Sequence, residues 1–99
     1  MSTDGFDLGL QYLLAAPSRA HTILTCVTAT LRDEDPHAPL TLDVLNEILH
    51  RNSLAVTAGL PAVVADDAIE HAARALPTIH PGETPDAYAL RVTHAAKGI

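Results

Sequence analysis

The chain has 99 residues, carries 6 Lys and Arg against 12 Asp and Glu, and is 47% hydrophobic. This length indicates a single domain over residues 1–99, and the ordinary apolar share argues against wholesale disorder. The formal net charge of −6 argues against nucleic acid and anionic membrane surfaces as partners, because both are bound through clustered Lys and Arg.

Membrane insertion and export are also disfavoured. No apolar run approaches the ~20 residues of a membrane-spanning helix. Asp4 and Asp7 interrupt any apolar signal-peptide pattern. Cys26 is the single cysteine, so an intramolecular disulfide cannot form. Together these features predict a cytoplasmic protein with no membrane partner.

The first half of the chain predicts two helices separated by a proline. In residues 4–16, an apolar row at helical spacing indicates one helix face: Phe6, Leu10, Leu13 and Leu14. Pro17 is expected to end this helix, because proline cannot donate a backbone hydrogen bond. Residues 18–32 form a second row through Ile23, Val27 and Leu31. Their many β-branched residues make a strand the competing interpretation, but strand alternation is not sustained, so a helix is predicted.

Three further helical segments follow. Thr41 is a suitable N-cap for a helix that ends at residues 50–52, with Ser53 capping a short continuation to Ala58. Pro61 opens the next helix, which Pro77 ends. Residues 84–86, Thr-Pro-Asp, are the clearest helix start in the chain. The sequence therefore predicts an all-α fold, a bundle of four to five short helices.

The most chemically suggestive group is a set of acids and histidines. Glu47 and His50 share a helix face as Glu-x-x-His, the half-motif of carboxylate-bridged di-metal bundles. Asp67 and His71 lie on the following helix. A small metal-binding bundle or enzyme using these four residues is therefore one hypothesis. Only one Glu-x-x-His unit is present, so solvated helix faces with local ion pairs are the simpler interpretation.

A second hypothesis concerns Ser53. Residues 52–54, Asn-Ser-Leu, resemble the Asp-Ser-Leu motif at which acyl carrier proteins attach phosphopantetheine. The resemblance implies a modified Ser53. Asn stands where the family has Asp, and residues 55–59 lack the acidic helix that follows the motif in carrier proteins.

Neither a nucleophile–base arrangement nor a glycine-rich phosphate loop is recognisable, so catalysis and a cofactor are not expected. The leading prediction is protein–protein contact, as an adaptor, regulator or self-assembling module. The apolar content is mostly small residues, and burial contributes only ~25 cal/mol per Å², which favours a homo-oligomer. The row in residues 61–76 is either the interface or internal core: Val64, Ala65, Ala68, Ala72 and Leu76.

Overall fold

The computed structural model describes the backbone of residues 3–97 and the side chains of residues 18–97. Within that part of the chain there are four helices and no strand: α1 (Thr3–Arg32), α2 (Leu42–Thr57), α3 (Ala62–Ala75) and α4 (Pro85–Ala96). The predicted all-α bundle is confirmed. No described helix is both long enough and apolar enough to cross a membrane.

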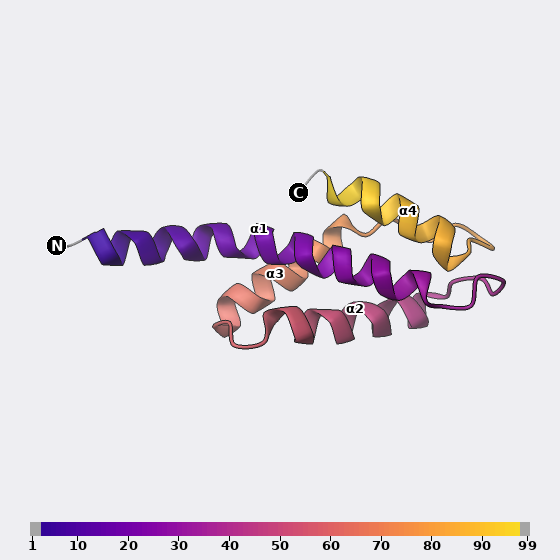
Figure 1. Ribbon diagram of the computed structural model, residues 1–99, viewed down its shortest axis with the longest axis horizontal. Coiled ribbons are helices and arrows are strands. Elements are labelled where there is room, and N and C mark those ends of the chain that lie inside the picture. Colours follow the sequence, from indigo (N-terminus) through magenta and orange to yellow (C-terminus); the bar gives the residue numbers. More distant parts are fainter. Residues whose placement is uncertain (1–2, 98–99) are drawn as a thin grey trace.

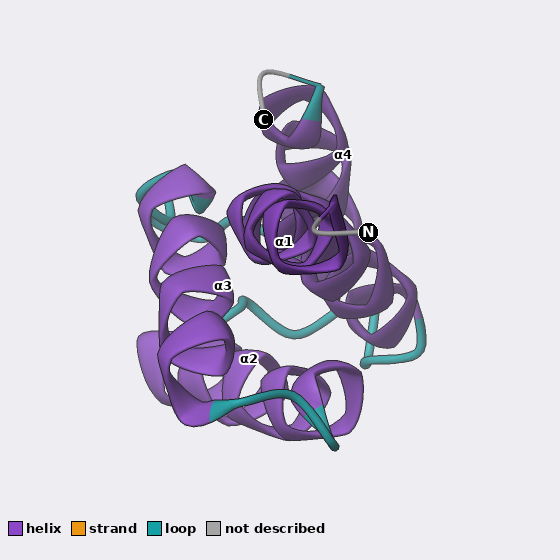
Figure 2. Ribbon diagram, turned by 90° about the vertical axis from the view of Figure 1, so that its left-hand side faces the viewer, coloured by secondary structure: helices purple, strands orange, loops and turns teal. Residues whose placement is uncertain are grey.

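Helix α1 is the central element of the bundle. Viewed along its axis, it has α2, α3 and α4 arranged around it (Figure 2). Its contribution to the core consists of fully buried side chains: Ala20, Ile23, Leu24, Val27 and Leu31. The molecule measures 58 × 23 × 17 Å. Its long dimension comes from α1, since 30 residues at 1.5 Å each span about 45 Å.

The predicted helix end at Pro17 is wrong, because α1 continues through this residue. A proline inside a helix removes one backbone hydrogen bond and costs ~3 kcal/mol. The residues on each side have helical spacing of their own. Once a helix is nucleated, each further residue adds a hydrogen bond. One missing bond in a 30-residue helix therefore weakens α1 without dividing it.

The β-branched stretch of α1 is helical, as predicted. Its threonines donate their hydroxyl hydrogens to the carbonyl four residues earlier, for example Thr25 to His21 (3.0 Å) and Thr28 to Leu24 (2.8 Å). These bonds satisfy the hydroxyls inside the helix. The strand interpretation is thereby excluded for this segment.

Helix α2 runs past the predicted end at residues 50–52 and stops only after Thr57. The Asn52 amide nitrogen donates to the Ile48 carbonyl (2.9 Å) and to the Thr30 hydroxyl of α1 (3.1 Å). Asn52 therefore joins two helices and does not act as a C-cap. The left-handed residue after the helix is Gly59, with φ of 82°, a conformation that glycine adopts without strain.

The last two helices begin as predicted. Thr84 accepts a hydrogen bond from the Ala87 amide (3.3 Å), and Pro85 occupies the first turn of α4. Helix α3 begins directly after Pro61 and buries Val64, Ala68 and Ala72, of which Ala68 and Ala72 pack in the common core. The middle of the apolar row of residues 61–76 is therefore internal core, while Ala65 and Leu76 are only partly buried.

Candidate functional site

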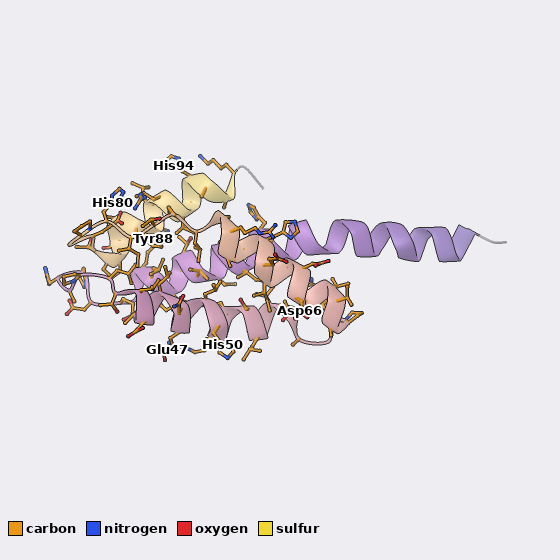
Figure 3. The ribbon with its side chains drawn as sticks, turned by 180° about the vertical axis from the view of Figure 1, so that it is seen from behind. Glu47, His50, Asp66, His80, Tyr88 and His94 are labelled. Carbon is orange, nitrogen blue, oxygen red and sulfur yellow. The ribbon has the colours of Figure 1, made fainter. Side chains whose placement is uncertain are left out.

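The four candidate metal ligands lie on solvent-exposed helix faces. Glu47 and His50 project from the outer side of α2 (Figure 3). A Glu47 carboxylate oxygen lies 3.4 Å from a guanidinium nitrogen of Arg51. On α3, the ring nitrogen Nδ1 of His71 lies 2.7 Å from the backbone carbonyl oxygen of Asp67, not from its carboxylate. Among the described residues, no three His, Cys, Asp or Glu side chains are close enough to hold one metal ion.

Ser53 lies inside α2 and is 1% exposed. Its hydroxyl oxygen has no hydrogen-bond partner among the described residues. In a carrier protein the modified serine opens a helix and must be reached by another enzyme. In this conformation the Ser53 hydroxyl is closed off from any such approach.

A groove lies between α2 and the C-terminal end of α3 with the loop that follows it, and we call it the α2–α3 groove. It has a volume of about 440 Å³ and is open to solvent. Its lining is predominantly apolar and contains no charged side chain: Leu42, Leu45, Asn46, Leu49, Ala73, Leu76, Pro77, Thr78 and Ile79. Leu42, one of the lining residues, is 64% exposed. The groove therefore presents an apolar surface that the chain itself leaves uncovered.

One wall of the α2–α3 groove, residues 76–79, is held by a polar cluster. Arg91 of α4 contacts the Glu83 carboxylate (2.7 Å) and donates to the Thr78 carbonyl (3.1 Å). The Tyr88 hydroxyl donates to the Pro77 carbonyl (2.6 Å). The Glu83 side chain is only 7% exposed. These contacts fix the loop on α4, so the wall of the groove is preorganised.

The cluster alters two titrations. Burial alone raises the pKa of Glu83, but the His80 amide and the Arg91 guanidinium outweigh it and hold the pKa below its ordinary value of 4.5. Burial raises the pKa of Tyr88 to about 12, with the nearby Arg91 opposing the rise. Glu83 is therefore the charged partner of Arg91 at neutral pH, while Tyr88 stays a neutral hydrogen-bond donor.

A second groove of about 390 Å³ lies between α1 and α4. Its basic side chains are His21, Arg32 and Lys97. Its threonines already donate to carbonyls of their own helices, as Thr93 does to Ala89 (3.0 Å). Only the three basic side chains therefore carry the charge to bind an anion, and they are spread along the length of the groove.

The N-terminal half of α1, residues 3–17, projects beyond the other three helices (Figures 1 and 3). We call it the α1 arm. Throughout the described part of the chain, no other helix runs beside it. Its apolar residues continue the spacing of the buried half with a seven-residue period. One row contains Phe6, Leu13, Ala20 and Val27, and the other contains Leu10, Pro17, Leu24 and Leu31.

Sequence reasoning missed this continuity because it divided the helix at Pro17. The spacing was visible in the sequence as two separate rows. It also missed Glu83 and Arg91, which lie eight residues apart on a loop and a helix. No local pattern links such a pair.

Comparisons with protein-family models, with curated protein sequences and with solved structures find no match for this chain.

Proposed function

We propose that this protein acts through protein–protein contact, with the α1 arm as the element that contacts the partner. The observation that carries the proposal is the unbroken seven-residue spacing along α1. In the bundled half, the same rows supply Ala20, Leu24, Val27 and Leu31, all 0% exposed. The arm continues those rows where its own chain provides no covering helix.

The energetics support an external partner. Burying a Phe or Leu side chain contributes ~1.5–3 kcal/mol relative to leaving it in water. Burying Phe6, Leu10 and Leu13 against a partner would therefore contribute several kcal/mol to binding. The arm is already helical, so this segment does not have to fold when it binds. A helix with one apolar face is recognised by laying that face into an apolar groove.

The experiment places a photoreactive amino acid at position 10 or at position 8 of the full chain. Leu10 lies on the apolar row, whereas Leu8 lies about 200° away around the same helix. The protein is irradiated both in the cells that produce it and after purification. The proposal requires a covalent protein adduct from position 10 in at least one of these settings, with little from position 8. No adduct from position 10, or equal adducts from both positions, would overturn it.

A further inference from the structure

We infer that residues 77–83 form a strap along one wall of the α2–α3 groove, and that a proton on the Glu83 carboxylate releases this strap while the helices stay folded. The strap lies between α3 and α4 in the chain and contains no helix or strand of its own. Pro77, Thr78 and Ile79 line the groove. This device lies in the bundled part of the molecule and is independent of the α1 arm.

The strap is anchored by a buried charge. The Glu83 side chain is 7% exposed and lies 2.7 Å from a guanidinium nitrogen of Arg91. Its carboxylate also accepts the backbone hydrogen of His80 (3.0 Å). Ile79, the large aliphatic side chain of the strap, is only partly buried against the core. Since charge-assisted hydrogen bonds are stronger than neutral ones, the hold on the strap depends on the ionised state of Glu83.

Two side chains of α4 hold the backbone of the strap. The same Arg91 nitrogen that contacts Glu83 donates to the Thr78 carbonyl (3.1 Å). The Tyr88 hydroxyl donates to the Pro77 carbonyl (2.6 Å). Tyr88 and His80 lie at the same end of the molecule (Figure 3). Arg91 therefore links the carboxylate at one end of the strap to a carbonyl near the other end.

A proton on Glu83 removes the charge that positions Arg91. The neutral carboxyl pairs more weakly with the guanidinium, and a cation without its counter-ion is more stable in water. The Arg91 side chain is 31% exposed, so it reaches water without crossing the core. The Thr78 carbonyl then loses its donor. Losing such a charged hydrogen bond changes an equilibrium constant by about 5–30-fold, so the open strap should become more populated by that factor.

The groups that face the Glu83 carboxylate come from the strap and from α4. Burial raises the pKa of Glu83, but the His80 amide and the Arg91 guanidinium outweigh it, helped by the charge of a protonated His80, and hold the pKa below 4.5. The Tyr88 hydroxyl is the other titratable group close enough to interact with Glu83. The loop before α2 contributes the Leu40 amide, which donates to the Glu83 carbonyl (2.7 Å). The open strap restores the ordinary pKa, so a fall in pH through the lowered pKa favours opening.

Release of the strap leaves the core in place. The buried core cluster comes from the four helices and Leu40, and the strap adds only Ile79 at its edge. The backbone of Glu83 also keeps its position, because Leu40 bonds its carbonyl and the next residue, Thr84, caps α4. Segments with few buried apolar contacts open locally at a lower free energy than the whole domain. Residues 77–82 are therefore able to move while α4 keeps its start.

Opening of the strap changes the α2–α3 groove. Pro77, Thr78 and Ile79 leave one wall, whereas Leu42 and Leu49 belong to α2 and stay in place. The groove therefore widens in acid, and its apolar lining becomes more accessible.

The test follows isoleucine methyl groups by NMR in the full chain. Ile79 reports on the strap, while Ile23 and Ile48, both 0% exposed, report on the core. At pH 7, Glu83→Gln should move the Ile79 signal toward its position in an unstructured peptide and leave Ile23 and Ile48 unmoved. The natural chain should show the same movement as the pH falls below about 4.5. Glu83→Gln should show no further movement over that pH range, because the amide does not titrate.

Glu34→Gln is the matched control. Glu34 lies on the loop before α2 and lines a small cavity with Leu40 and Pro85, beside the end of the strap. The substitution removes one carboxylate from this region without touching the Arg91 contact. Its Ile79 signal should titrate as it does in the natural chain.

Three results would overturn the inference. The first is an Ile79 signal that keeps its natural position in Glu83→Gln at pH 7 or in the natural chain at low pH. The second is movement of Ile23 and Ile48 together with Ile79, because the strap would then open only when the bundle unfolds. The third is a pH response that persists in Glu83→Gln or disappears in Glu34→Gln, because another group would then bind the proton that matters.

Discussion

The two halves of α1 share one spacing of apolar residues but differ in what surrounds them. In residues 18–32 the rows are buried by α2, α3 and α4, and Leu24 and Val27 are 0% exposed. The backbone of residues 3–17 leads beyond the end of the bundle (Figure 1). An amphipathic pattern therefore identifies a face that favours burial without identifying which surface buries it. The two halves differ in their tertiary contacts, and substitutions in each half can measure how much those contacts stabilise the fold.

The largest expected effect is that of the same substitution in the two halves. Leu24→Asp removes a fully buried leucine, which costs ~2–5 kcal/mol, and places an unpaired carboxylate in the core, which adds several more. Since domains are stable by only ~5–15 kcal/mol, this variant should be unfolded by circular dichroism. Leu10→Asp should retain its helical spectrum and a cooperative urea transition. If Leu10→Asp unfolds as well, the arm is part of the core and the comparison fails.

The helix ends show how far the sequence predicts the fold. Thr84-Pro85-Asp86 predicted the start of α4 because capping is a local interaction, and Thr84 makes the expected bond to the Ala87 amide. The same local reasoning wrongly predicted a helix end at Pro17. Its cost is local, but the outcome depends on the stability of the helix on both sides. The predicted end at Asn52 was wrong as well, because α2 continues through this residue and its side chain donates to Thr30 of α1.

The candidate site was less predictable. The groove joins α2 to residues 76–79, and the position of that loop depends on Arg91 and Glu83 meeting across eight residues. The acids and histidines that the sequence suggested as metal ligands are neighbours along their own helix faces, as their spacing requires. Spacing on one helix does not bring two helices together, and Glu47 and His50 project from the outer side of α2 (Figure 3).

The next largest effect is expected at the junction of the two halves. Pro17→Ala restores the missing backbone hydrogen bond donor within α1 and should stabilise the helix by up to ~3 kcal/mol. The measurements are the free energy of unfolding in urea and the helical circular dichroism signal, both of which should increase. Ser18→Ala, the neighbouring change, is the control and should shift stability by less than ~0.5 kcal/mol. An unchanged Pro17→Ala variant would show that the two halves are separate helices.

A smaller, pH-dependent effect is expected in the bundle. Glu83→Gln removes the charge that pairs with Arg91 and should cost ~1–2 kcal/mol at pH 7. The folded-state pKa of Glu83 is lowered from 4.5, so its contribution is present above that value and is lost as pH falls through the folded-state pKa. The stability difference between the natural chain and Glu83→Gln should therefore shrink below about pH 4.5. Glu47→Gln, at an exposed ion pair, is the control and should show little difference at any pH. A Glu83→Gln difference that is constant with pH would contradict the assignment.

The smallest expected effect is a gain of stability at Ser53. Its hydroxyl is buried without a hydrogen-bond partner among the described residues, and an unsatisfied buried hydroxyl costs ~1–3 kcal/mol. Ser53→Ala removes that oxygen, improves helix propensity within α2 and leaves only a small void, so the free energy of unfolding should rise by ~1 kcal/mol. Ser18→Ala, which makes the same change at an exposed helical serine, separates the propensity gain from the burial gain. A loss of stability in Ser53→Ala would mean that the hydroxyl is satisfied inside the bundle.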